Sequence, residues 1–282
     1  MTSAVDLPEP NALRALRYEI SGSTALVTLS RPHRANAWNG TMHRELLHVM
    51  AGLEHLPGLR AVVITGEGPA FSVGGDSQAL DDHAERGSYD TGLSEDEVRP
   101  GTNLRPEFDD DLTWLLGYRL PVIAAVNGAV AGVSLALVCL CDLRFGAASA
   151  KLTTAAPKLG LPAEYGLSWV LPRIIGVTRA ADLLMSGRVV TVAETADWGL
   201  WNEVCPDAET TLDSALRYAD LLASTTGPHA VATTKQQLYE DLLRNNPAAS
   251  VRDSKHLLDR AMGSAEYREG IAAFLERRPP NF

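Results

Sequence analysis

Cysteine is scarce in this chain, and the three that occur form no recognisable motif. Cys139, Cys141 and Cys205 do not have the spacing of a metal-ligand set, and an odd number argues against the paired disulfides of a secreted domain. This usage is typical of a reducing compartment. We therefore expect the protein in the cytoplasm, without a metal site.

Long apolar runs and clusters of positive charge are also missing. No stretch is long enough to span a bilayer, and the N-terminal residues, with Asp6 and Glu9, lack the apolar segment of a signal peptide. The formal net charge of −10 comes from residues of both signs without a basic stripe, which disfavours nucleic acid and anionic membrane surfaces as partners. We expect a soluble protein that acts on a small molecule.

The composition is otherwise that of a globular protein with a large core. Hydrophobic residues make up 45% of the 282 positions, and the length favours one main body with an appended part. The segment Gly66-Glu67-Gly68 lacks the third glycine and the following helix of a dinucleotide-binding fingerprint. Because the chain shows no metal, nicotinamide or flavin signature, we expect no cofactor.

Hydrophobic patterning predicts strands that alternate with helices, and hence an α/β fold. Two β-rich runs, 17–20 and 25–29, flank Ser21-Gly22-Ser23 and predict a hairpin. A run with helical spacing begins at Thr41 and stops before Pro57. Further helical runs lie near 212–222, 229–243, 248–262 and 265–277.

Two apolar strands, 61–65 and 122–126, each lead into a loop of small residues. The loops are Phe71-Ser72-Val73-Gly74-Gly75-Asp76 and Asn127-Gly128-Ala129-Val130-Ala131-Gly132-Val133-Ser134. Backbone N–H groups beside glycine are accessible, so the two loops could direct donors onto one ligand oxygen. Such an oxyanion hole would stabilise an enolate or a tetrahedral anion, and two ordinary tight turns are the alternative interpretation.

The order of these segments resembles that of the crotonase, or enoyl-CoA hydratase/isomerase, superfamily. The similarity runs through Val27-Thr28-Leu29-Ser30-Arg31-Pro32, Arg34-Ala35-Asn36-Ala37, Val62-Val63-Ile64-Thr65-Gly66, the glycine loops, Cys141-Asp142-Leu143-Arg144, Leu171-Pro172-Arg173 and Glu269-Gly270-Ile271-Ala272-Ala273-Phe274. The resemblance implies a crotonase-type spiral of ββα repeats with the helices packed outside. It also implies an acyl-CoA substrate, of which coenzyme A is a part.

The resemblance implies a division of the chain as well. Residues 1–205 would form the crotonase core, and the helical region 206–282 would cover the acyl pocket and build a homotrimer or a hexamer of two trimers. Within the core, the acidic segment from about Asp81 to Asp111 contains several glycines and prolines and predicts a long excursion. Such a loop is often a lid or pocket wall, and a solvated insertion without a role is the equal alternative.

By position in the family's motifs, Gly75 and Val133 would supply the two N–H donors to the thioester oxygen. Gly75 follows the family pattern, whereas Val133 stands where the family usually has glycine. Valine keeps the N–H but brings an isopropyl group that could narrow the site. The helix that begins near Ser134 would add the positive end of its dipole to the hole.

The acidic residues decide which proton transfers are available. Hydratases of this family use two glutamates, and the matching positions here are Ala136 and Ala156, which cannot move a proton. One acid remains, Glu164, in a segment that resembles the stretch carrying the base of isomerase-like members. Pro162 predicts a helix start close to Glu164 that would favour the ionised form, whereas an apolar pocket would oppose it. An exposed carboxylate at a helix start is the alternative interpretation of Glu164.

Contacts with coenzyme A in the family come mostly from the backbone of the Arg-Ala-Asn-Ala loop. The resemblance therefore assigns Arg34, Ala35 and Ala37 to CoA binding and places Asp76 close to the adenine pocket. Arg34 could also meet a phosphate, and Arg31, Arg277 and Arg278 are weaker candidates.

Three functions agree with these residues. The leading one is an enoyl-CoA isomerase that uses Glu164 as acid and base and the oxyanion hole to hold a dienolate. The second is a hydratase in which Glu164, or an acid of the 81–111 excursion, replaces the missing glutamates. The third is a catalytically silent acyl-CoA binding protein, suggested by Ala136 and Ala156 together.

Overall fold

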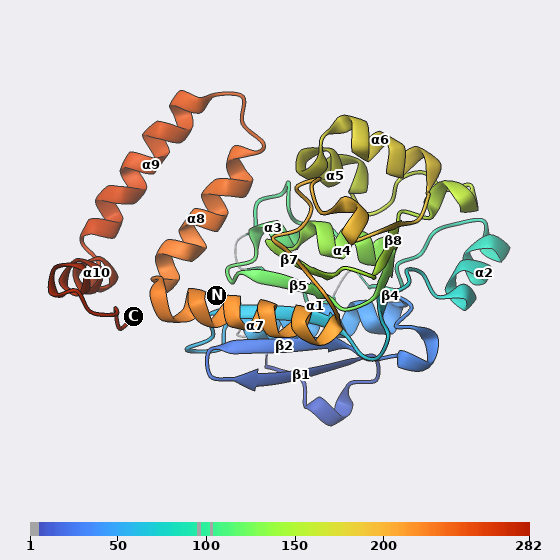
Figure 1. The fold of residues 1–282 in the computed structure, drawn as a ribbon, viewed down its shortest axis with the longest axis horizontal. Helices are drawn as coiled ribbons and strands as arrows, with labels where there is room; N and C mark the ends of the chain where they lie inside the picture. The colour runs from blue at the N-terminus through green and yellow to red at the C-terminus, as the bar shows by residue number, and fades with distance from the viewer. Residues whose placement is uncertain (1–5, 95–96, 102–103) are drawn as a thin grey trace.

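Two β-sheets and the helices around them form the body of the protein in a computed structural model, which describes residues 6–94, 97–101 and 104–282 (Figure 1). The six-stranded sheet has the order β1-β2-β3-β5-β7-β10 and the four-stranded sheet the order β4-β6-β8-β9. The strands are β1 (Leu16–Ser21), β2 (Thr24–Leu29), β3 (Ala61–Gly66), β4 (Ala70–Ser72), β5 (Val122–Val126), β6 (Ala129–Ala131), β7 (Leu143–Ala147), β8 (Lys151–Thr153), β9 (Val190–Thr191) and β10 (Glu203–Cys205). The helices are α1 (Gly40–Glu54), α2 (Ser77–Arg86), α3 (Trp114–Gly117), α4 (Val133–Leu140), α5 (Leu167–Ile175), α6 (Val177–Ser186), α7 (Ala208–Thr225), α8 (Pro228–Asp241), α9 (Pro247–Met262) and α10 (Ala265–Glu276).

The strand pairing explains the continuous apolar runs of the sequence. The predicted hairpin is confirmed, because β1 and β2 pair antiparallel, and β2, β3, β5, β7 and β10 then pair in parallel. Val62 and Ile64 of β3 face the main core, whereas Ala61 and Val63 pack toward α7, whose Ala215 lies in the same cluster. A parallel strand covered on both faces needs apolar residues at consecutive positions.

Glycine marks the corners where the chain passes from one sheet to the other. A Cβ at Gly66 would lie 2.3 Å from the carbonyl oxygen of Ala70, and one at Gly128 would lie 2.1 Å from that of Pro69. No other residue fits such an approach of two backbones. The corners let β3 continue into β4 and β5 into β6, which are neighbours in the second sheet.

The predicted helices are present, with shifts of a few residues. Helix α1 begins at Gly40 because the side chain of Asn39 accepts a hydrogen bond from the N–H of Met42. Helix α7 lies against the six-stranded sheet, and α8, α9 and α10 extend from the body at the left of Figure 1. In the part of the chain that the structure describes, no helix is both long and apolar enough to cross a bilayer.

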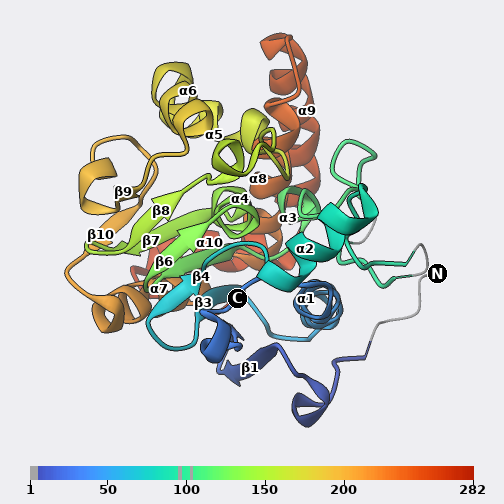
Figure 2. The same ribbon diagram turned by 90° about the vertical axis from the view of Figure 1, so that its right-hand side faces the viewer.

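The acidic excursion has more regular structure than its composition suggests. Asp81–Arg86 belongs to α2, whose start is capped by the side chain of Asp76. Figure 2 looks onto the end of the molecule where α2 lies, with the loop of the excursion beside it. Positions 95–96 and 102–103 of the predicted excursion lie outside the described residues.

Candidate functional site

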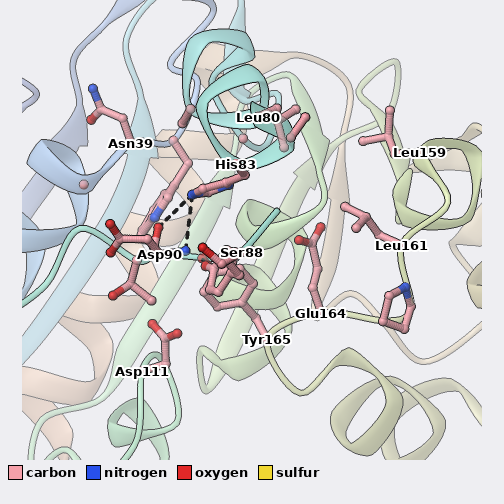
Figure 3. Close-up of a pocket in the computed structure, with 18 of the residues that line it drawn as sticks. Asn39, Leu80, His83, Ser88, Asp90, Asp111, Leu159, Leu161, Glu164 and Tyr165 are labelled. Carbon is pink, nitrogen blue, oxygen red and sulfur yellow. Dashed lines mark hydrogen bonds between the residues drawn. The ribbon is translucent and has the colours of Figure 1, made fainter. Parts of the chain in front are cut away.

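A cavity of about 750 Å³ lies between the excursion and the loop that precedes α5. Its walls are largely apolar and include Leu80, Leu159 and Leu161 (Figure 3). The ionisable side chains that line it, besides Tyr89 and Tyr165, are His83, Asp90, Asp111 and Glu164. The excursion thus forms one wall of the cavity.

Glu164 reaches the cavity beside the second glycine loop. A Cβ at Gly132 would lie 2.8 Å from Oε1 of Glu164, and Gly132 itself has a φ of +53°. Two features require glycine at position 132: its positive φ disfavours any other residue, and the carboxylate occupies the place of a Cβ. The structure therefore brings Glu164 to the backbone immediately before Val133.

Burial shifts the pKa of Glu164. The carboxylate is partly buried, and desolvation raises its pKa above the ordinary value of 4.5. Helix α5 begins only at Leu167, whose N–H donates to the carbonyl oxygen of Glu164. Of the two opposing effects predicted for this residue, the apolar surroundings therefore dominate over the helix start.

The two glycine loops are tied to each other by side chains. Strands β4 and β6 pair in parallel, and the hydroxyl oxygens of Ser72 and Ser134 lie 2.6 Å apart. Ser72 also donates to the carbonyl oxygen of Asn36, at 2.6 Å. These buried hydrogen bonds fix the segments that carry Gly75 and Val133 relative to each other.

The N–H groups of Gly75 and Val133 have no acceptor among the described residues. The N–H of Trp38 donates to the carbonyl oxygen of Gly74, and the carbonyl oxygen of Trp38 accepts from the N–H of Asp76. The N–H of Gly75, which lies between these two residues, therefore points away from Trp38. Val133 is the first residue of α4, and the first N–H groups of a helix lack intrahelical partners. Both groups therefore keep their capacity to bind an oxygen.

The side chain of Val133 does not narrow the cavity. It is buried in the main core, and Val133 is not among the described residues that line the cavity, whereas Gly75 is. The expectation that valine narrows the site therefore fails, because the isopropyl group points into the protein.

The residues predicted to bind coenzyme A do not line the cavity. Arg34 is exposed, Ala35 has a φ of +49°, and Ala37 is buried. Asp76 is buried, lies 2.8 Å from Arg31 in an ion pair, and accepts from the N–H of Gln78. Burial opposes ionisation of Asp76, but the hydrogen bonds with Arg31 and Gln78 lower its pKa below the ordinary value.

Ala136 and Ala156 are both buried, and neither is among the described residues that line the cavity. Sequence reasoning overlooked other residues. Tyr89 belongs to the excursion but carries no motif, and Trp38 directly follows the predicted CoA loop; Asp111 was included only as one of the acids of the excursion. The hydroxyl of Tyr89 contacts that of Tyr165. Tyr165 could have been identified from the sequence because it directly follows Glu164.

The fold and the cavity together define an α/β enzyme of the crotonase type. The family model described as enoyl-CoA hydratase/isomerase matches residues 19–282, so the chain belongs to this family. It is 35% identical over 268 residues to a Rhodobacter capsulatus protein named "Probable enoyl-CoA hydratase", covering 95% of this chain and 97% of the relative. It is 34% identical to the 1,2-epoxyphenylacetyl-CoA isomerase of Escherichia coli K12, covering 91% and 93%. The crystal structure of an enoyl-CoA hydratase from Polaromonas sp. JS666 superimposes with a TM-score of 0.82 at 30% identity, covering 95% and 99%.

Proposed function

We propose that the protein is an enoyl-CoA isomerase that uses Glu164 as its single acid and base. The observation that carries this proposal is the half-buried carboxylate of Glu164 beside Gly132. Alanine occupies both positions that the family resemblance matches to the hydratase glutamates, so Glu164 would act alone. Glu164 removes a proton from C2 of a 3-enoyl-CoA. The N–H groups of Gly75 and Val133 hold the oxygen of the resulting dienolate, and Glu164 returns the proton at C4.

The surroundings of Glu164 suit both halves of this reaction. A base whose pKa is raised by burial gains proton affinity, so it accepts the proton from C2 and remains a competent acid when it returns the proton at C4. Leu159 and Leu161 supply an apolar wall against which an acyl chain can pack. The reaction consumes no other reagent, and we propose that it needs no cofactor.

The remaining features of the proposal concern binding and assembly. Arg34, Ala35 and Ala37, with Asp76 behind them, would bind the coenzyme A portion of the substrate. Large apolar side chains are exposed on the C-terminal helices, among them Leu238, Leu258, Phe274 and Leu275. This exposure supports residues 206–282 as the assembly region of a homotrimer or of a hexamer of two trimers. We also propose that the protein is cytoplasmic.

The test follows the ultraviolet absorbance of the conjugated enoyl thioester during incubation with a 3-enoyl-CoA. The wild-type protein should increase this absorbance, and Glu164→Gln should lower kcat by at least about 100-fold, the range for losing a general base. Because the ionised form accepts the proton, wild-type kcat/KM should fall as the pH drops below the raised pKa of Glu164. The matched control is Glu209→Gln, which changes an exposed glutamate in the first turn of α7. No change of absorbance with either protein would leave the silent acyl-CoA binding protein, whereas equal nonzero rates would show that Glu164 is not the base.

Hydration is the second candidate, because Asp111 lines the same cavity as Glu164. Asp90 is less suited, since hydrogen bonds from the N–H of Gly92 and from Arg86 lower its pKa and occupy its carboxylate. A hydratase would decrease the absorbance of a 2-enoyl-CoA, and both Glu164→Gln and Asp111→Asn would abolish that decrease.

A further inference from the structure

The loop that carries Glu164 has few attachments to the rest of the protein. Within residues 161–166, only Glu164 and Tyr165 are partly buried, and the other residues are exposed. Among the described residues, the contact between the hydroxyls of Tyr165 and Tyr89 is the only side-chain hydrogen bond that this loop makes. Exposed loops are more mobile than the elements they connect. The position of the carboxylate therefore depends on how its neighbours in the loop are held.

A tight turn joins Glu164 to helix α5. The N–H of Leu167 donates to the carbonyl oxygen of Glu164 at 3.0 Å, so these two residues are the ends of a four-residue turn. Both central residues have a positive φ, which is +50° at Tyr165 and +75° at Gly166. Such a turn favours glycine, asparagine or aspartate at these positions. A tyrosine at the first of them has a strained backbone.

The ring of Tyr165 restrains this turn. It packs against the main hydrophobic core and lies edge to face with the ring of Tyr89, with centroids 6.2 Å apart. A residue keeps an unfavourable backbone conformation only where its surroundings enforce it, and such residues cluster at functional sites. Figure 3 shows that Glu164 and Tyr165 reach the same cavity from adjacent positions of the loop. Because the peptide bond between them is rigid, fixing the tyrosine also limits where the carboxylate can lie.

We infer that Tyr165 is a positioning residue for Glu164, because its ring anchors the turn that follows the carboxylate. The inference rests on the proposed function only in taking Glu164 as the reacting acid and base. The carboxylate is confined on one side by the backbone of Gly132, where a Cβ would lie 2.8 Å from Oε1, and on the other by the anchored turn. Anchoring is the task of the ring and does not need the hydroxyl of Tyr165.

The first measurement compares kcat with a 3-enoyl-CoA among variants of the full chain. Tyr165→Phe keeps the ring and removes the hydroxyl, so its kcat should stay close to the wild-type value. Tyr165→Asn suits the turn, because asparagine adopts a positive φ readily, but it lacks the ring. Its kcat should fall about tenfold or more, since a displacement of roughly 1 Å can cost about 100-fold. Tyr267→Asn makes the same change at an exposed position of α10 and should leave kcat unchanged.

The second measurement reports on the carboxylate itself and needs no turnover. Burial, and not a neighbouring charge, raises the pKa of Glu164. Besides Tyr165, the other ionisable side chains that line the cavity are His83, Tyr89, Asp90 and Asp111. Loss of the ring admits water to the carboxylate, so Tyr165→Asn should lower this pKa toward 4.5, whereas Tyr165→Phe should not. NMR titration of the side-chain carboxyl carbon, identified by its absence in Glu164→Gln, measures the pKa directly.

Three results would overturn the inference. These are an unchanged kcat in Tyr165→Asn, an unchanged pKa of Glu164 in that variant, and an equal loss of kcat in Tyr165→Phe, which would assign the effect to the hydroxyl. Tyr165→Gly gives a second variant without the ring, and free of backbone strain, if Tyr165→Asn fails to fold.

The two proposals can fail separately. If Glu164→Gln keeps the wild-type rate, the proposed function fails, and the pKa measurement still tests whether Tyr165 holds the carboxylate in its buried place. If Glu164→Gln is inactive and Tyr165→Asn is not impaired, only the role of Tyr165 fails.

Discussion

The two walls of the cavity are built in different ways. The wall that carries Gly75 is formed by strand ends and glycine corners, and the buried Ser72 to Ser134 hydrogen bond joins its two loops, whereas Glu164 reaches it from the largely exposed loop before α5. The wall formed by the excursion is held by side chains near the surface, such as Tyr89, which is 60% exposed. The backbone donors of the proposed oxyanion hole therefore lie on the more firmly fixed wall, and the excursion forms the other.

The difference between the two walls indicates which substitutions should impair the reaction with every substrate. A proton transfer is sensitive to displacements of less than 1 Å, so its groups need neighbours that cannot move independently. Recognition of an acyl chain tolerates more adjustment, and surface loops commonly supply it on a rigid scaffold. Substitutions on the first wall should therefore affect all substrates alike, and those on the second should depend on the acyl group.

Gly132→Ala should have the largest effect and tests the first wall. The new Cβ would displace the carboxylate of Glu164, so kcat with a 3-enoyl-CoA should fall by about 100-fold, the cost of misplacing a reacting group by roughly 1 Å. Gly22→Ala is the matched control, because Gly22 has a similar φ of +58° with no atom within 4 Å of its Cβ position. Gly22→Ala should lose about 1 to 2 kcal/mol of stability, measured by chemical denaturation. Gly132→Ala should lose at least as much, because its ψ of −127° lies outside the left-handed helical region. Full activity in Gly132→Ala would show that the position of Glu164 is not critical.

The Ser72 to Ser134 hydrogen bond offers a test of intermediate size. Ser72→Ala leaves the hydroxyl of Ser134 and the carbonyl of Asn36 without this partner, which should cost about 1 to 3 kcal/mol of unfolding free energy. Ser134→Ala should cost less, because Ser72 keeps its bond to Asn36. A double-mutant cycle by urea denaturation should give a coupling of about 1 kcal/mol between the two serines. Zero coupling would contradict the idea that these side chains tie the glycine loops together.

The first wall was largely predictable from sequence, because its parts follow local rules. Continuous apolar runs indicated β3 and β5, and the glycines after them indicated the loops with Gly75 and Gly132. Glu164 could be singled out because its segment resembles the one that carries the base of isomerase-like members, and because alanine stands at both positions that the resemblance matches to hydratase glutamates. The dominance of burial over the helix start depends on which side chains surround the carboxylate, and no local pattern contains that information.

The second wall was harder to predict for a physical reason. Acidic composition with scattered glycine and proline indicated a loop, although Asp76 caps a helix over Ser77–Arg86. The contact of Asp111 with His43 joins positions 68 residues apart in the chain, and only the packing of α1 against this segment brings them together. The ion pair of Asp76 with Arg31 likewise joins two separate segments, and no local pattern indicates it.

Tyr89→Phe should have the smallest effect and tests whether the second wall is held by separable side-chain contacts. The variant removes the hydroxyl contact with Tyr165 but keeps the ring packing against His83 and Tyr165. Because Tyr89 is exposed, stability should change by less than about 1 kcal/mol, whereas KM should rise a few-fold with kcat nearly unchanged, as steady-state kinetics would show. Tyr267→Phe, at an exposed tyrosine of α10, is the control. A loss of kcat as large as that of Gly132→Ala would mean that the excursion positions Glu164, and the distinction between the walls would fail.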